Sequence, residues 1–195
     1  MIPTTTNPIA LFQTWFDEAH HCGLSEPDAM TIATATKQGI PSTRIVLLRH
    51  VDEHGFVFYT NLTSKKGTEL QENPYVSLNF HWMPLKKQVR VEGIAQQVSD
   101  EEADRYFANR VRGSQISAWA SKQSEEIEYS EAFAERVENI TQQYAEQPLP
   151  RPPFWSGFRI VPYQIEFWQE RPFRMHEREI YQKTIQGWEV GKYYP

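Results

Sequence analysis

The sequence predicts a mainly β domain, an antiparallel barrel or sandwich, with helices on its outside. Short runs rich in Val, Ile, Thr, Tyr and Phe have the composition of strands. Turn residues such as Gln38-Gly39 and Met83-Pro84 separate these runs, so successive strands lie close together along the chain. The predicted strands cover residues 30–36, 43–50, 56–60, 75–82 and 88–98, and then 157–169, 174–182 and 188–193 near the C-terminus.

Helices are predicted where apolar residues recur every three or four positions. Asn7 and Pro8 are typical of a helix start, and Gly23 is typical of a helix end. No repeat or second-domain boundary interrupts the chain, so residues 1–195 are expected to form a single domain. Further helices are expected over residues 64–72, 100–109, 115–121 and 125–146, the last ending before the proline-rich stretch 148–153.

The composition argues against several classes of function. A chain of 195 residues with 39% hydrophobic and 13% aromatic residues can form a folded core. The net charge of −5 argues against binding nucleic acid. No apolar run approaches the ~20 residues of a membrane span. Since no signal peptide is recognisable either, a cytoplasmic protein without membrane contact is expected. One cysteine excludes an intrachain disulfide, and the histidine spacings favour no metal site.

A cluster of cations lies near the C-terminus, in the stretch RMHER at residues 174–178. If this stretch is extended, Arg174, His176 and Arg178 share one face, with neighbours roughly 6.5–7 Å apart. Such a group repels itself unless an anion or a carboxylate lies among its members. The pattern fits either a solvated edge strand paired with nearby glutamates or a site for a planar anionic ligand.

Two more segments offer cations. Residues 44–49, RIVLLR, have the pattern of a buried strand with an arginine at each end, although an ordinary core strand fits as well. Residues 59–66 run from a strand through a turn into a helix that Ser64 can cap. Lys65 and Lys66 then lie in its first turn, where the helix dipole favours an anion, although a solvated lysine pair fits as well. Together the three segments indicate binding of a phosphorylated small molecule and do not identify it.

From about Pro8 to Pro195 the chain resembles the pyridoxine/pyridoxamine 5′-phosphate oxidase family. The matching blocks, in the same order, are RIVLLR (44–49), FYTNLTSKK (58–66), QVRVEG (88–93), SQISAWASKQS (114–124), FWSGFR (154–159) and EFWQ…RMHER (166–178). The family fold is a split β-barrel that binds FMN, and its members are homodimers with FMN at the subunit interface. The resemblance therefore implies FMN, a homodimer, and a dimerisation and active-site region at about 154–195.

The resemblance also implies roles for individual residues. The FMN site would comprise Arg44, Ile45, Val46, Leu47, Leu48, Arg49, Tyr59, Thr60, Lys65, Lys66, Gln88, Gln123, Ser124, Trp168 and Arg178, several of them from the partner subunit. The substrate phosphate would be held by Arg49, Tyr106, Arg110 and Ser114. Arg174 and His176 would be catalytic, covering and orienting the pyridine ring. The implied reaction oxidises pyridoxamine or pyridoxine 5′-phosphate to pyridoxal 5′-phosphate and reduces O₂ to H₂O₂.

The chain departs from the family pattern at several points. Glu177 stands where the family usually has Asp or Asn, Arg49 where many members have Lys, and Lys65 where many have Arg. By strand alternation Glu177 is expected to point away from its cationic neighbours. A short segment before the first helix is expected to weaken closure over the substrate.

Two alternatives are open at this point. The related FMN oxidase of phenazine biosynthesis can carry Glu in the C-terminal motif, but Tyr106, Arg110 and Ser114 match the grip on a B6 phosphate. The other alternative is a flavin- or pyridoxal-phosphate-binding protein without turnover. The presence of both Arg174 and His176 argues against it.

Overall fold

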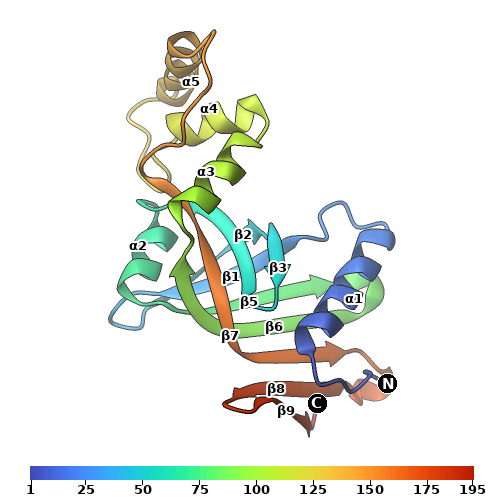
Figure 1. Ribbon diagram of the computed structural model, residues 1–195. Helices are drawn as coiled ribbons and strands as arrows, with labels where there is room; N and C mark the ends of the chain where they lie inside the picture. The colour runs from blue at the N-terminus through green and yellow to red at the C-terminus, as the bar shows by residue number, and fades with distance from the viewer.

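A computed structural model describes all 195 residues and confirms the predicted mainly β architecture. The strands form one antiparallel sheet in the order β2-β1-β5-β6-β7-β4-β3, and β8 and β9 extend it from β7. The sheet curls into a half-barrel, which confirms the predicted split β-barrel (Figure 1). The strands are β1 (Ala29–Ala35), β2 (Pro41–Leu47), β3 (His50–Asp52), β4 (Gly55–Asn61), β5 (Tyr75–Trp82), β6 (Lys87–Gln97), β7 (Trp155–Gln169), β8 (Glu177–Thr184) and β9 (Gly187–Tyr193).

The long strand β7 belongs to two parts of the sheet. Its first half pairs with β4 and its second half with β8, while β6 runs along its other side. The register shifts between Glu92 and Gly93, and β7 turns sharply near this point (Figure 1). Glycine is required here, because a Cβ at Gly93 would lie 2.6 Å from the Val161 carbonyl oxygen. The bulge thus separates the barrel from the β7-β8-β9 extension.

The first helix starts where the sequence predicts and packs against the barrel. The Asn7 side chain caps it by accepting hydrogen bonds from the backbone N–H groups of residues 9 and 10 at 3.1 and 3.2 Å. Phe12 packs edge-on against Phe56 and Phe80, with ring centroids 4.8 and 4.9 Å apart. The helices are α1 (Pro8–His21), α2 (Lys65–Glu72), α3 (Asp100–Ala108), α4 (Arg112–Ala120) and α5 (Ala132–Gln143).

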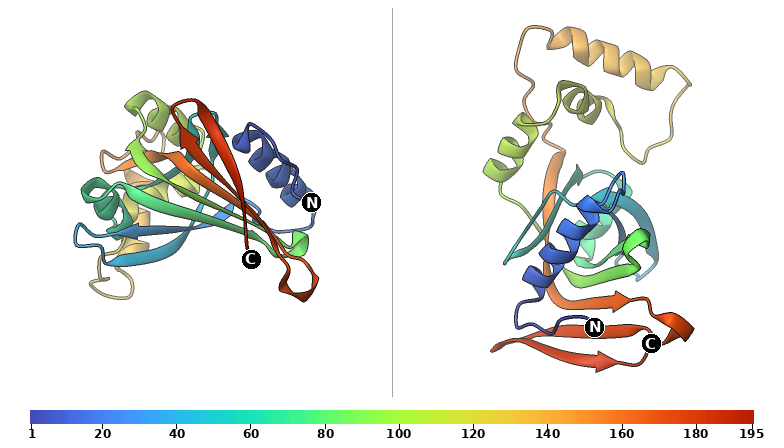
Figure 2. Two further views of the ribbon diagram at one scale, coloured as in Figure 1. Left: turned by 90° about the horizontal axis from the view of Figure 1, so that it is seen from below. Right: turned by 90° about the vertical axis from the view of Figure 1, so that its right-hand side faces the viewer.

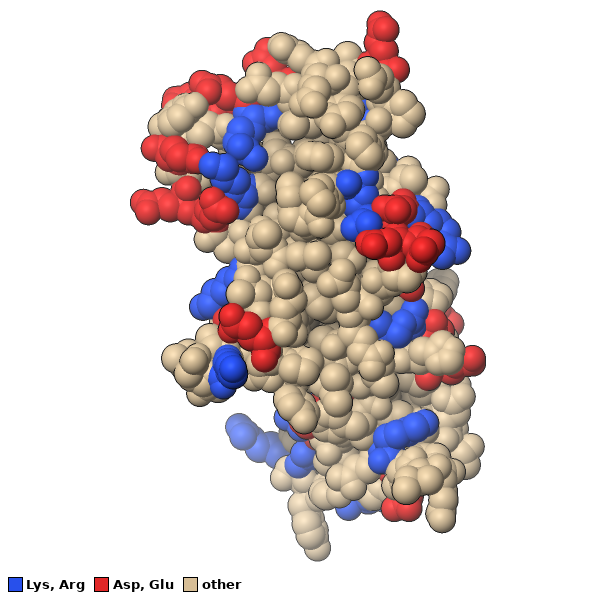
Figure 3. All heavy atoms as spheres, turned by 60° about the vertical axis from the view of Figure 1, so that its left-hand side comes forward, with Lys and Arg blue, Asp and Glu red and all other residues tan.

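Helices α3, α4 and α5 form a layer of their own at one end of the molecule. Figure 2 shows this layer opposite the β8-β9 hairpin and both chain termini. A small second core of Phe107, Ile116, Leu149 and Trp155 holds it to the start of β7. On the face in Figure 3, Lys and Arg side chains are interspersed with Asp and Glu. None of the helices has the length and apolarity needed to cross a membrane.

The predicted strand 43–50 is wrong in its extent. The chain leaves β2 after Leu47 and starts β3 at His50, because the N–H of Leu48 bonds the Asp28 carbonyl and the N–H of Arg49 bonds the Val57 carbonyl. The expected burial of this strand is also wrong, since the Ile45 side chain is 62% exposed. β2 is an edge strand that pairs with β1 on one side only, so no neighbouring strand covers its other edge.

Other predicted boundaries also differ from the structure; the helix expected over 115–121, for example, covers Arg112–Ala120. The helix expected over 125–146 begins only at Ala132, and Ile127, which lies before it, is 60% exposed. The strand expected over 174–182 begins at Glu177. Residues Pro172–Arg174 form a 3₁₀ turn, and Phe173 and Arg174 have φ values of 58° and 60°. The expectation that Arg174 and His176 share a strand face with Arg178 is therefore wrong.

Candidate active site

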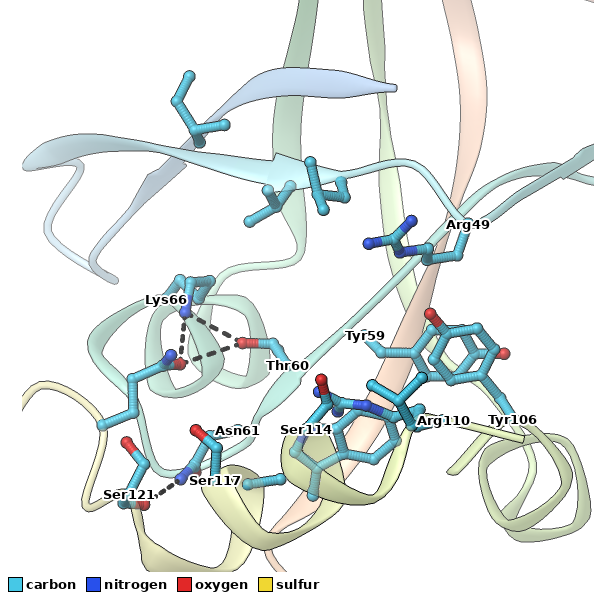
Figure 4. Close-up of a pocket in the computed structure, with 17 residues that line it drawn as sticks. Arg49, Tyr59, Thr60, Asn61, Lys66, Tyr106, Arg110, Ser114, Ser117 and Ser121 are labelled. Atoms are coloured by element: carbon cyan, nitrogen blue, oxygen red, sulfur yellow. Dashed lines mark hydrogen bonds between the residues drawn. The ribbon is translucent and has the colours of Figure 1, made fainter. Parts of the chain in front are cut away.

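A cavity of about 560 Å³ lies between the sheet and the helices α2, α3 and α4 (Figure 4). Three elements that are distant in sequence meet there because β2, β4 and α4 surround one space. The predicted site residues that line it are Ile45, Val46, Leu47, Arg49, Tyr59, Thr60, Lys66, Tyr106, Arg110, Ser114 and Gln123. A second cavity of about 460 Å³ shares Ile45, Lys66 and Gln123 with it and adds the predicted residues Arg44, Lys65 and Ser124.

Lys66 is a buried cation that faces only neutral oxygen atoms. Ser64 caps α2 as predicted, by accepting a hydrogen bond from the Gly67 N–H at 3.3 Å. The Lys66 Nζ donates to Gln123 Oε1 at 2.7 Å, Thr60 Oγ1 at 3.0 Å and Ser64 Oγ at 3.2 Å. Burial, together with the charge of Arg44, lowers the pKa of Lys66 to about 8. An anion at this position would therefore supply the negative countercharge that the neutral oxygens around Lys66 do not provide.

Arg44, in contrast, is neutralised inside the protein. Its guanidinium donates to Ser42 Oγ at 2.5 Å, to Thr34 Oγ1, and to Glu69 Oε2 at 3.3 Å. Glu69 is 4% exposed. Burial tends to raise the pKa of this carboxyl, but hydrogen bonds from Thr34 and Ser42 and the Arg44 charge lower it. The network fixes Arg44 on the wall of the smaller cavity.

A second cation without a carboxylate partner lies at the other end of the larger cavity. The Arg110 guanidinium lies over the Trp155 ring, 4.8 Å from its centroid, and forms no ion pair. Its pKa is lowered by burial and by the charge of Arg49. Arg49 bonds Asp28 Oδ2 at 2.9 Å and approaches from the sheet side, whereas Arg110 and Ser114 come from the helix side (Figure 4).

Aromatic rings form the wall beside Arg110. The Tyr59 ring stacks on Tyr106, with centroids 3.7 Å and planes 3° apart, and is nearly parallel to Trp155 at 5.4 Å. Burial and the carboxylate of Glu102 raise the pKa of Tyr59 to about 12. A Cβ at Gly157 would lie 2.7 Å from the Tyr59 ring, so the glycine allows this packing. The wall is thus a rigid, flat surface.

Six predicted site residues do not line the cavities. Leu48 is 4% exposed and its side chain belongs to the main core. Gln88, Trp168 and Arg178 are paired neighbours on β6, β7 and β8, and the His176 ring lies 4.7 Å from that of Trp168. Arg174 is exposed on the turn before β8. This second cluster lies at the opposite end of β7 from Trp155, so one subunit does not bring the two groups together.

Several lining residues were not predicted. The structure adds Asn61, Val111, Ser117, Ala118, Ser121 and Trp155 to the larger cavity. Ser114 and Ser117 on α4 and its C-cap residue Ser121 recur at i, i+3 and i+7, so they lie along one side of the helix. That spacing was present in the sequence and could have indicated a hydroxyl-lined surface. Asn61 directs its side chain to the Ser121 carbonyl at 3.4 Å, a contact that has no sequence signal.

Comparison with solved structures places the fold in a known class. The structure of PhzG from Burkholderia lata 383 in complex with tetrahydrophenazine-1-carboxylic acid superposes with a TM-score of 0.93 at 30% identity, covering 98% of this chain and 94% of that one. A pyridoxamine 5′-phosphate oxidase-related, FMN binding protein from Nostoc punctiforme has a TM-score of 0.76 at 18% identity, covering 94% of this chain and 97% of that one. The second likeness shows the fold alone. The class is that of split-barrel proteins.

Sequence comparison then identifies the family. Residues 16–144 match the pyridoxamine 5′-phosphate oxidase model, and residues 155–195 match the pyridoxine 5′-phosphate oxidase C-terminal dimerisation region. The chain therefore belongs to the pyridoxamine 5′-phosphate oxidase family, and it is an enzyme, an oxidoreductase.

Curated relatives agree with the family match. The pyridoxine/pyridoxamine 5′-phosphate oxidase of Gluconobacter oxydans is 48% identical over 195 residues, which is 100% of this chain and 98% of that protein. The protein of the same name from Rubrobacter xylanophilus is 51% identical over 182 residues, which is 93% of this chain and 84% of that protein.

Proposed function

We propose that the protein is an FMN-dependent oxidase that converts pyridoxamine 5′-phosphate and pyridoxine 5′-phosphate to pyridoxal 5′-phosphate and reduces O₂ to H₂O₂. One observation carries the proposal. The larger cavity contains two half-buried or buried cations without carboxylate partners, Lys66 and Arg110, on different elements. Each is suited to one phosphate group, so the space fits a phosphorylated cofactor and a phosphorylated substrate together.

The residues around Lys66 fit the phosphate of FMN. Lys65 and Lys66 start helix α2, whose N-terminal N–H groups and dipole favour an anion. Gln123 and the Arg44 guanidinium complete this end of the space. FMN, when bound, supplies the hydride acceptor for the C4′ carbon and passes the electrons to dioxygen. The exposed Ile45 on β2 offers an apolar surface for a flat ring.

The residues around Arg110 fit the phosphate of the substrate. Arg110 and Arg49 can donate hydrogen bonds to it from the helix side and the sheet side, and Ser114 adds a hydroxyl beside Arg110. The stacked rings of Tyr59 and Tyr106 limit the movement of the bound ester. Holding the phosphate in this way orients the substrate for reaction without contributing to the chemical step itself.

A second subunit completes the site in this proposal. Gln88, Trp168 and Arg178 lie too far along β7 to reach the cavity of their own subunit. Trp168 and Arg178 belong to the region that matches the dimerisation model, and Gln88 pairs with Trp168. Arg174 lies in the same region and is exposed. Arg174 and His176 would then cover the pyridine ring bound to the other subunit. A guanidinium is always protonated, so Arg174 aligns the substrate and stabilises charge and is not a base.

The phenazine-type alternative has weaker support. PhzG is 30% identical to this chain, whereas the two oxidases above are 48% and 51% identical. Arg49, Arg110 and Ser114 also line the same cavity, and two guanidiniums beside a hydroxyl favour a phosphate ester as the substrate. A cytoplasmic location stays a prediction of the sequence.

The direct experiment mixes the FMN-loaded protein with pyridoxine 5′-phosphate in the absence of oxygen. The proposal predicts rapid bleaching of the flavin, followed by pyridoxal 5′-phosphate and H₂O₂ once air is admitted. Tight binding without bleaching would indicate a protein without turnover. If neither B6 phosphate bleaches the flavin, the proposal is wrong.

A further inference from the structure

The turn between β7 and β8 has a backbone that needs external support. Phe173 and Arg174 have φ values of 58° and 60°, in the left-handed region that side chains disfavour. A left-handed backbone at a residue with a side chain is strained. Inside the turn, a single backbone hydrogen bond links the Met175 N–H to the Pro172 carbonyl at 3.2 Å. Contacts at the base of the turn must therefore hold Arg174 in place.

Arg171 closes the base of this turn with two different groups. Its guanidinium Nε donates to Glu177 Oε1 at 2.9 Å, an ion pair in which both side chains are about 30% exposed. Its backbone N–H donates to His176 Nδ1 at 3.1 Å. The first and last residues of the turn are thus joined across the strained pair.

The second of these contacts fixes the protonation of the His176 ring. A backbone N–H can only donate, so Nδ1 must accept and carries no proton. The neutral ring then has its proton on Nε2. His176 therefore presents a hydrogen-bond donor on the side of the ring away from Arg171. The ring packs at a tilt of 46° against Trp168, with centroids 4.7 Å apart.

Glu177 also connects this turn to the N-terminal segment. Its Oε2 accepts a hydrogen bond from the Ile2 N–H at 2.7 Å, and Ile2 is 4% exposed. The hydrogen bond from Arg171 lowers the pKa of Glu177, with burial opposing it and the Ile2 N–H adding to it. Each carboxylate oxygen thus has its own partner. Aspartate is one methylene, or about 1.5 Å, shorter and cannot keep both contacts from the same backbone position.

We propose that Glu177 is a positioning residue: through Arg171 it holds the turn that carries Arg174 and fixes His176 as the Nε2-protonated tautomer. The catalytic part of this inference rests on the proposed function, because Arg174 and His176 act on the substrate only there. The tautomer itself does not depend on it. The inference gives a role to the residue at which this chain departs from the family motif.

The experiment compares the FMN-loaded wild type with Glu177→Gln and Glu177→Asp. The glutamine variant keeps the shape and loses the charge, and we expect kcat to fall about tenfold with unchanged FMN affinity, since small misplacements cost this much or more. The aspartate variant keeps the charge and one of the two contacts, so it should lose less. Glu189→Gln on β9 is the matched control, since Glu189 is exposed and unpaired, and should behave as wild type.

The second readout is NMR of the histidine ring nitrogens without substrate, at mildly alkaline pH, with the His176 signal assigned by its absence in His176→Gln. The wild type should show a protonated Nε2 and an unprotonated Nδ1, and Glu177→Gln should show a mixture. A protonated Nδ1 in the wild type, or wild-type kcat and tautomer in both Glu177 variants, would overturn the inference. An inactive wild type with the expected tautomers would overturn the proposed function alone.

Discussion

Arg110→Gln separates binding of the substrate phosphate from folding. Arg110 has no carboxylate partner, and burial and Arg49 lower its pKa, so its charge costs free energy in the empty protein. Removing the charge should leave the Tm unchanged or slightly raised. In the complex the same change removes a charge-assisted hydrogen bond to the phosphate, which is worth about 1.5–3 kcal/mol. At 1.4 kcal/mol per factor of ten, kcat/KM should fall roughly 10- to 150-fold.

The assay compares pyridoxine 5′-phosphate with pyridoxine, which lacks the phosphate. The loss should affect the phosphorylated substrate alone and appear in KM, because the phosphate is bound equally in the ground and transition states. Arg151→Gln is the control. Arg151 is paired with Asp100 at 2.7 Å and Asp104 at 2.5 Å, so its loss should lower the Tm and leave the phosphate preference intact. Equal losses with both substrates, or no loss with either, would refute the placement of Arg110.

Three further predictions follow from the same geometry. Since burial lowers the pKa of Lys66 to about 8, FMN affinity in fluorescence titrations should fall as pH rises through about 8, and Lys66→Met should bind weakly at every pH. The free energy of unfolding of the apo protein should increase as pH rises from about 8 to 10.5, because in this range the unfolded chain holds the Lys66 proton more tightly than the folded protein does. Gly157→Ala should destabilise by about 1–3 kcal/mol in urea unfolding by pushing on the Tyr59 ring, whereas Gly113→Ala, with open space around it, should not destabilise. Arg174→Ala should reduce turnover far more than FMN affinity. Equal losses in turnover and FMN affinity would show that Arg174 does not act on the substrate as proposed.

The strand composition predicted most of the fold. Residues 75–82 were predicted as a strand and form β5 with those bounds. The alternation of apolar residues cannot show where a chain changes partner, and this explains the missed break at Leu48 between β2 and β3. The left-handed turn at Phe173 and Arg174 has no glycine to indicate it, so the strand that follows was predicted to begin at residue 174, three residues too early.

The candidate site was predictable to a different degree. The cation segments at 44–49 and 59–66 indicated a phosphate ligand, and the structure brings them to one space because β2 and β4 both line it. The roles of Tyr106, Arg110 and Ser114 came from the family resemblance. Contacts across long sequence separations, such as Glu69 with Arg44, were not visible, because no local pattern determines which buried carboxylate meets which guanidinium.

The central claim is that each active site combines the larger cavity of one subunit with the turn between β7 and β8, which carries Arg174, of the other subunit. Mixed dimers of Arg110→Gln and Arg174→Ala test it, assayed at a pyridoxine 5′-phosphate concentration below KM. About half of the dimers in an equal mixture are mixed, and each has one intact site, so about a quarter of wild-type activity should return. If the two variants stay as inactive mixed as apart, each site lies within one subunit and the account is contradicted.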